Sequence, residues 1–473
     1  MIIPISIVAV TGVLALILEM VRPKSNNNAI VGVSLLGLVL AGLSVVAQFP
    51  SPDLATLGDM IVRDRFGLVV QLLLIGTGFL AILFSDGYLR EKRIPFGEFY
   101  PLLLWSLTGA MVMSSSTNLL MTFLGLEILS IALYVMAGMS RSETRSEESA
   151  LKYFLLGAFA SGFLLYGIAL VYGATGSLDV SDISRAWMQN APGQHALTAF
   201  GIGMILIGLS FKAAFVPFHQ WTPDVYQGAP TNVTAFMAAG SKIGALAALW
   251  RVLDGAIAVK AVWLPALFWI AIITMTVGNL LALVQKDVKR VLGYSSIAHA
   301  GYILVAIVAH FKAPNIIGFG TIVYYLLSYT LMTVGAFAVI TLAANRGKES
   351  TSFADMRGLV RRSPFAAGAI IIFMASLIGI PPTSGFAGKF MIFQDALKAG
   401  LTPLAIVLAV NSILSVAYYL GIAKAMFVED PEAPETMRPV RLDAGLAAAC
   451  ALCIAGIFGA GILIGPLMDA LLH

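Results

Sequence analysis

The chain is a succession of long apolar segments separated by short polar ones. An α-helix needs about 20 apolar residues to span the hydrocarbon core of a membrane, and fourteen segments of this chain approach or exceed that length. The pattern therefore predicts an all-α polytopic membrane protein. The expected helices cover residues 2–21, 29–48, 66–85, 100–115, 117–139, 150–173, 198–217, 230–253, 262–284, 291–310, 316–344, 364–400, 402–428 and 442–468.

Prolines are expected to interrupt two of the predicted helices. The seventh is interrupted at Pro217 and the twelfth at Pro381-Pro382. Proline removes a backbone donor and clashes with the preceding turn, and the freed carbonyls are tolerated at membrane depth only where protein or water satisfies them. The two interruptions are five helices apart, so the second unit is expected to lie upside down relative to the first, as in transporters built from inverted repeats. We predict inverted five-helix repeats, helices 4–8 and 9–13, with discontinuous helices 7 and 12.

This division gives four regions. Residues 1–99 form an N-terminal three-helix region, 100–255 the first repeat, 256–428 the second inverted repeat and 429–473 a region with the fourteenth helix. The longest expected loop, 174–197, leaves no room for a soluble domain. The sequence contains no glycine-rich nucleotide-binding motif placed between a strand and a helix.

Composition and charge agree with a membrane location. The chain is 59% hydrophobic and 11% charged, whereas soluble domains are about 25% charged. Odd-numbered loops carry nineteen of the 29 Lys and Arg residues and even-numbered loops carry seven. Because cytoplasmic loops are enriched in Lys and Arg, we expect both termini outside. The same loops account for the net charge of +4 without a nucleic acid partner.

Four ionisable residues stand inside apolar segments. Glu127 lies in the fifth expected helix, Lys212 in the seventh, Lys242 in the eighth, and Lys389 follows the proline pair of the twelfth. A charge at mid-membrane costs about 2.5–3.5 kcal/mol on insertion scales, so such residues are functional candidates by default. Desolvation penalises the charged form of a buried lysine, which can then exchange protons near neutral pH. We therefore predict a proton relay through these four residues.

Three further residues are possible members of this relay: His299, His219 and Asp395. Each position also has a structural interpretation. Glu127 could form a static ion pair with a lysine, His299 could be a packing histidine, and His219 could cap a helix end. Cys450 and Cys453 lie in one apolar helix and are interpreted as small packed side chains, because metal sites usually need four ligands. No side chain offers redox chemistry, so the driving force has to come from a partner.

Four stretches carry a resemblance to a known family. They are SFKAAFVPFHQWTPDVYQGAPTNVTAFMAAGSK at 210–242, ESALKYFLLGAFASGFLLYG at 148–167, KDVKRVLGYSSIAHAGY at 286–302 and GIPPTSGFAGKF at 379–390. Together they resemble the chain N family of bacterial NADH–quinone oxidoreductase (respiratory complex I), whose mitochondrial counterpart is NADH dehydrogenase subunit 2. The resemblance extends over essentially the whole chain.

The resemblance implies an antiporter-like, proton-translocating subunit of the membrane arm, coupled to electron transfer from NADH to quinone elsewhere in the complex. The family's glutamate of helix five falls on Glu127, and its lysines of helices seven, eight and twelve fall on Lys212, Lys242 and Lys389. FMN, iron–sulfur clusters and quinone are then expected in partner subunits, with no cofactor or metal in this chain. Chain M, a similar subunit, carries a glutamate at the position of Lys389, which favours chain N.

The resemblance also implies partners and a location. It predicts contact with chain M, with small membrane chains such as K and J, and with lipids, in a bacterial inner membrane with both termini periplasmic. The enzyme would be an H⁺-translocating NADH:quinone reductase. Alternatives that share the fold are a subunit of a Na⁺/H⁺ antiporter, of a membrane-bound hydrogenase or of a ferredoxin-driven plastoquinone oxidoreductase. A purely structural spacer is a further alternative.

Overall fold

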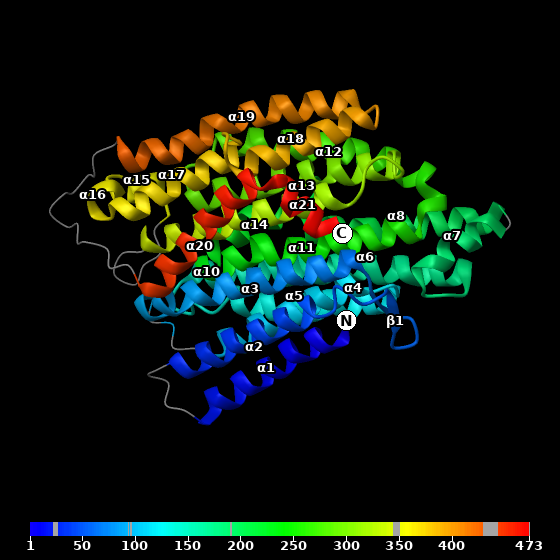
Figure 1. The fold of residues 1–473 in the computed structure, drawn as a ribbon, viewed down its shortest axis with the longest axis horizontal. Coiled ribbons are helices and arrows are strands. Elements are labelled where there is room, and N and C mark those ends of the chain that lie inside the picture. The colour runs from blue at the N-terminus through cyan, green and yellow to red at the C-terminus, as the bar shows by residue number, and fades with distance from the viewer. Residues whose placement is uncertain are drawn as a thin grey trace.

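The computed structural model describes residues 1–21, 27–92, 94, 97–189, 192–343, 351–428 and 443–472. Residues 429–442, where the predicted C-terminal region begins, and His473 lie outside the described residues. So do seven basic residues of the predicted loops: Arg22, Lys24, Arg93, Arg346, Lys348, Arg438 and Arg441. Long helices run side by side along the longest axis of the molecule (Figure 1).

The elements follow one another in this order. The helices are α1 (Ile2–Val21), α2 (Asn28–Val46), α3 (Arg65–Glu91), α4 (Phe99–Ser115), α5 (Leu119–Ala137), α6 (Thr144–Thr175), α7 (Val180–Gln189), α8 (Pro192–Ala213), α9 (Trp221–Gly228), α10 (Thr231–Phe236), α11 (Lys242–Gly255), α12 (Lys260–Leu283), α13 (Val288–Lys312), α14 (Gly320–Ile340), α15 (Phe353–Met356), α16 (Leu359–Arg362), α17 (Pro364–Ile378), α18 (Ser384–Lys398), α19 (Thr402–Phe427), α20 (Ala444–Ile462) and α21 (Ile464–Leu472). Among the described residues, strands β1 (Leu54–Thr56) and β2 (Ile61–Arg63) pair as an antiparallel hairpin.

The all-α membrane fold is confirmed. Twelve helices of the described chain are long and apolar enough to span a membrane, and α4 and α17 are shorter apolar helices. The exact count of fourteen stays a prediction. One expectation is wrong: the 174–197 segment is not wholly a loop, because it contains α7. That helix is short and amphipathic, with Val180 and Ile183 buried, so it does not form a long apolar run.

Both helices that were expected to break at prolines are interrupted. α8 ends at Ala213 and α9 begins at Trp221, and the Val216-Pro217 peptide bond between them is cis. α17 ends at Ile378 and α18 begins at Ser384, with a cis bond between Pro381 and Pro382. Whether a two-fold axis in the membrane plane relates the two interruptions, as inverted repeats require, stays a prediction.

The interior of the bundle is formed by the helices that carry the candidate lysines and their neighbours. An 18-residue stretch of the span Thr231–Gly255 is entirely buried in the chain, whereas 33% of the corresponding stretch of Thr144–Thr175 is buried. α13 and α14 are also mostly buried. The first of these spans comprises α10, the π-helical turn η1 (Met237–Ser241) and α11. Polar residues on these helices, such as Lys242 and His299, are therefore enclosed by protein.

The start of α1 and the end of α21 both point toward the side of the bundle on which β1 lies (Figure 1). The amino group of Met1 donates to Oε1 of Gln48 at 2.7 Å, and Arg65 donates to the carbonyl of Ala470 at 2.7 Å. Gln48, just after α2, and Arg65, at the start of α3, therefore contact residues near the two described ends of the chain. This arrangement requires an even number of crossings between Met1 and Ala470.

Candidate functional site

Lys212 lies in the last turn of α8, directly before the first helix interruption. Its Nζ donates to Oγ of Ser130 on α5 at 2.8 Å and to the hydroxyl of Tyr153 on α6 at 2.9 Å. The preceding carbonyl, of Phe211, accepts a hydrogen bond from the indole of Trp221 at 2.9 Å. The interruption thus leaves the end of α8 satisfied and places the ammonium among three helices.

Glu127 lies one helical turn before Ser130 on α5, at the spacing that puts both residues on one face. It is half-buried and accepts a hydrogen bond from the hydroxyl of Ser161 on α6. Among the described ion pairs within 4 Å, none joins Glu127 to Lys212. The predicted pair is therefore not a direct contact in this conformation; Ser130 accepts from Lys212 and Ser161 donates to Glu127.

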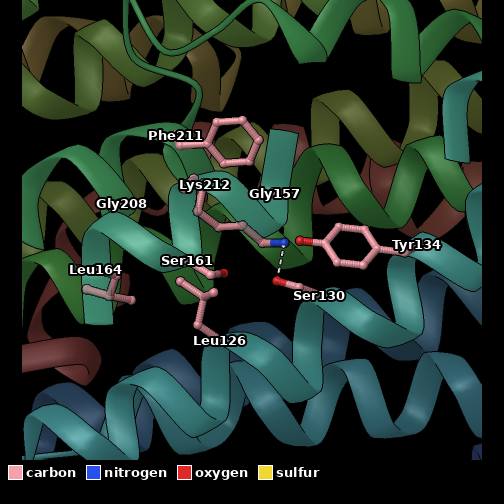
Figure 2. A pocket seen from close by; sticks show the side chains of 10 residues that line it. Leu126, Ser130, Tyr134, Gly157, Ser161, Leu164, Gly208, Phe211 and Lys212 are labelled. Carbon is pink, nitrogen blue, oxygen red and sulfur yellow. Dashed lines mark hydrogen bonds between the residues drawn. The ribbon is translucent and has the colours of Figure 1, made fainter. Parts of the chain in front are cut away.

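A small cavity lies between these groups. Its volume is about 10 Å³, and its lining comes from α5, α6 and α8. Figure 2 shows the Nζ of Lys212 pointing toward Ser130 and the hydroxyl of Tyr134, with Ser161 on the opposite wall. The full lining comprises Leu126, Ser130, Tyr134, Gly157, Ala160, Ser161, Leu164, Gly208, Phe211 and Lys212.

Lys242 lies at the end of the π-helical turn η1, where α11 begins. Its Nζ donates to both the carbonyl and the Oγ of Ser296 on α13. The hydroxyl of Tyr329 on α14 donates to the same Oγ at 2.8 Å. π-Helical turns are rare and occur often at functional sites; this one was not predicted from the sequence.

His299 follows Ser296 by three residues on α13 and is buried. Its Nδ1 is 2.8 Å from the hydroxyl of Tyr325 and its Nε2 is 3.1 Å from the hydroxyl of Tyr419. Each ring nitrogen therefore has a partner in either tautomer, since a hydroxyl can donate or accept. This arrangement is compatible with both predicted roles, a packing histidine and a relay member.

Lys389 lies on α18 and reaches back across the second interruption. Its Nζ donates to the carbonyls of Leu377 at 2.8 Å and Ile378 at 2.9 Å. These carbonyls belong to the last turn of α17, so no N–H group of that helix donates to them. Lys389 thus caps the half-helix that the proline pair terminates.

The two remaining candidates lie apart from these contacts. Asp395 on α18 accepts from the hydroxyl of Thr321 at 2.6 Å, and Lys398 lies 3.8 Å from its Oδ1. His219 lies half-buried in the connection between α8 and α9, and its carbonyl accepts from the N–H of Thr222 at 3.0 Å. The structure does not connect either residue to a candidate lysine by a described hydrogen bond.

The sequence did not indicate the hydroxyl groups that surround the candidate residues. They belong to Ser130, Tyr153, Ser161, Ser296 and Tyr329. A signal was present for Ser130, which lies three residues after Glu127 in an otherwise apolar helix. Tyrosines are common at membrane interfaces, so their sequence positions alone did not distinguish them. In the described part of the chain, no group of three or more His, Cys, Asp or Glu side chains is placed to hold a metal ion.

Comparisons with known proteins agree with this geometry. Residues 116–415 match the family model described as NADH:quinone oxidoreductase/Mrp antiporter, transmembrane. NADH-quinone oxidoreductase subunit N of Trichlorobacter lovleyi is 42% identical over 432 residues, covering 91% of this chain and 88% of that protein. A chain of respiratory complex I from Thermus thermophilus is 36% identical, with a TM-score of 0.83 and 99% of each chain covered.

A chain of the Mrp complex from Dietzia shares the fold at 22% identity, with a TM-score of 0.87 over 100% of this chain and 96% of that one. At that identity the likeness concerns the fold alone. The subunit N relatives are much closer in sequence over most of their length. The chain therefore belongs to the NADH:quinone oxidoreductase/Mrp antiporter family, in its NADH-quinone oxidoreductase subunit N group.

Proposed function

We propose that Glu127, Lys212, Lys242 and Lys389 are the proton-carrying residues of this chain. The chain is a proton-translocating subunit of the membrane arm of NADH–quinone oxidoreductase. It belongs to an H⁺-translocating enzyme, and its own part is proton transfer across the membrane rather than electron transfer.

One observation carries this proposal: the three lysines share the same kind of environment. Their exposed fractions are 3% for Lys212, 2% for Lys242 and 6% for Lys389. Each ammonium donates to two neutral acceptors. Among the residues that the structure describes, no carboxylate lies within 4 Å of any of the three as an ion pair.

These acceptors suit a group that changes its charge. An ammonium has three N–H donors, and the amine that remains after loss of one proton has two. Both acceptors of each lysine can therefore keep their hydrogen bonds when the proton leaves. A static ion pair needs an opposite charge to offset the desolvation of a buried ion, and the lysines here lack one at contact distance.

The energy for translocation has to come from elsewhere in the complex. We expect FMN, iron–sulfur clusters and the quinone site in partner subunits, and contacts with chain M and small membrane chains such as K and J. The location that fits is a bacterial inner membrane with both termini in the periplasm. The loop bias in Lys and Arg supports this orientation.

Lys212→Arg tests the proposal within the assembled complex. Arginine keeps the positive charge and can donate to Ser130 and Tyr153, but it does not release a proton in proteins. We expect a complex that assembles and retains its charge at this position, yet has strongly reduced quinone reduction and proton pumping. The measurements are NADH–quinone turnover and the number of protons moved per NADH in reconstituted vesicles.

Lys260→Arg is the matched control, because this lysine is exposed at the start of α12. Its variant is expected to behave like the wild type in both measurements. Wild-type turnover and stoichiometry in Lys212→Arg would mean that Lys212 has a static role. That result would remove it from the relay.

A further inference from the structure

The small cavity beside Lys212 has the volume and the lining of a site for one water molecule. A water centre needs roughly 10–15 Å³ and two to four polar partners, and this cavity measures about 10 Å³. The hydroxyls of Ser130, Tyr134 and Ser161 and the ammonium of Lys212 supply polar groups in its wall (Figure 2). The remaining wall is apolar, so a water molecule there would be held at one place.

The hydrogen bonds around the cavity leave matching groups on opposite sides. Lys212 has three N–H donors, of which Ser130 and Tyr153 accept two. Ser161 uses its hydroxyl proton toward Glu127, and its oxygen keeps lone pairs that can accept. A water molecule between them can accept from Lys212 and donate to Ser161. From Lys212 through the water and Ser161 to Glu127, each donor then faces an acceptor.

We propose that this cavity binds one water molecule, and that the hydroxyl of Ser161 relays the proton between Lys212 and Glu127. The proposal rests on the proton-relay function and adds a residue to it. The ammonium gives one proton to the water, the water gives another to Oγ of Ser161, and Ser161 gives its own proton to the carboxylate. The result is a neutral amine, a neutral carboxylic acid, and an unchanged water and serine. The reverse sequence restores both charges.

The geometry explains why a relay is needed here. Glu127 and Lys212 form no ion pair within 4 Å, so direct transfer is excluded in this conformation. Proton transfer requires heavy atoms within hydrogen-bond distance or one intervening water. Ser161 is the hydroxyl that contacts the carboxylate while facing the cavity. Ser130 lies on the same cavity, but it accepts from the lysine and has no described hydrogen bond to the carboxylate.

Two substitutions of Ser161 test the hydroxyl itself. Ser161→Ala removes the relaying group, whereas Ser161→Thr keeps a hydroxyl on the same carbon. In the assembled complex we expect proton pumping to fall roughly tenfold or more in Ser161→Ala, since positioned proton-transfer groups typically contribute at least that much. Ser161→Thr should recover most of the loss. Ser149→Ala is the matched control on the same helix, because that hydroxyl donates to the backbone carbonyl of Ser146 at 2.9 Å.

A third substitution tests the water site. Ala160→Val places two methyl groups in the lining and fills the cavity without removing a polar side chain. We expect it to reduce pumping as Ser161→Ala does. Assembly of each variant is checked by the amount of intact complex in the membrane, and a solvent isotope effect on pumping should change in Ser161→Ala but not in Ser149→Ala.

Three outcomes would overturn the inference. Normal pumping in Ser161→Ala alongside defective pumping in Lys212→Arg would remove Ser161 and leave the lysine relay intact. Equal loss in Ser161→Ala and Ser161→Thr would show that packing, not the hydroxyl, matters. Normal pumping in an assembled Ala160→Val complex would exclude the water. If Ser161→Ala and Lys212→Arg both pump normally, the proposed function itself is overturned.

Discussion

The candidate lysines differ in how the fold satisfies them. Lys212 donates to side-chain hydroxyls, Lys242 to one serine through two atoms, and Lys389 to carbonyls at a helix end. The carbonyls that receive Lys389 are fixed by the end of α17, whereas hydroxyls can rotate between donating and accepting. The protonation of Lys389 therefore depends more directly on the geometry of a helix interruption than that of Lys212 or Lys242.

This difference leads to a prediction for Lys389→Met. The variant keeps an unbranched stem but leaves the carbonyls of Leu377 and Ile378 without the donor that the wild type provides. We expect the complex to assemble with a modest loss of stability, of about 1–3 kcal/mol for the buried carbonyls, and to lose proton pumping. The measurement is proton stoichiometry in reconstituted vesicles. Lys398→Met, on an exposed lysine of the same helix, is the control, and normal stoichiometry in Lys389→Met would make Lys389 structural.

At the residue scale, the sequence supplied the charged members of the site but not their partners. A lysine in a long apolar segment is recognisable without coordinates, because its cost in the membrane is large. A serine or tyrosine in the same segment costs far less and is therefore common. The assignment of Ser161 to Glu127, or Ser296 to Lys242, depends on which helices pack together, and that is a property of the three-dimensional fold.

At the element scale, close packing of α4 and α5 positions the glutamate. A Cβ on Gly109 would lie 2.4 Å from the backbone nitrogen of Leu129 and 2.5 Å from the carbonyl of Gly125. The backbones of the two helices therefore touch, as small residues allow in membrane bundles. Glu127 lies between the two α5 residues in this contact, so its position depends on this approach.

Gly109→Ala should separate the two helices. We expect destabilisation of about 1–3 kcal/mol, the usual cost of overpacking, measured as a lower melting temperature of the detergent-solubilised complex and less chain in the membrane. Gly162→Ala is the control, because a Cβ on this exposed α6 glycine meets no atom within 4 Å. Equal melting temperatures for Gly109→Ala and the wild type would show that the contact between α4 and α5 is loose.

The helix interruptions were predictable because proline acts through local chemistry. The π-helical turn before Lys242 was not, since its residues Met237–Ser241 continue the apolar segment that predicts an ordinary α-helix. Similarly, α7 was missed because it is amphipathic and short. Elements whose form depends on contacts with other segments are those that a hydropathy pattern does not reveal.

At the scale of the whole molecule, the two interruptions carry their lysines in opposite order. Lys212 precedes the interruption after α8, whereas Lys389 follows the one before α18. In both cases the lysine lies within one or two helical turns of unwound backbone. Lys242 and His299 lie on buried helices in the chain segment between these interruptions. A proton path along the middle of the bundle would thus pass from one interrupted helix to the other.

The connections between helices provide an internal check on the predicted topology. The N–H of Thr117 donates to the carbonyl of Met60, and the N–H of Val180 donates to the carbonyl of Thr117. These residues belong to three even-numbered connections. The N–H of Phe353 donates to the carbonyl of Lys286, which joins two odd-numbered connections. Even-numbered connections thus contact one another, and odd-numbered connections contact one another. This is expected if successive connections lie on alternate sides of a membrane.

The two faces of this membrane protein can be distinguished by labelling introduced cysteines. Asp59, at the turn between β1 and β2, is exposed and belongs to an even-numbered connection, whereas exposed Lys286 belongs to an odd-numbered one. We expect a thiol-reactive, membrane-impermeant reagent to label Asp59→Cys in intact spheroplasts and Lys286→Cys only in inverted vesicles. Cys450 and Cys453 are buried, so they should contribute little background. Labelling in the opposite order would mean that the Lys and Arg bias misassigns the faces, and with them the direction in which the relay releases its protons.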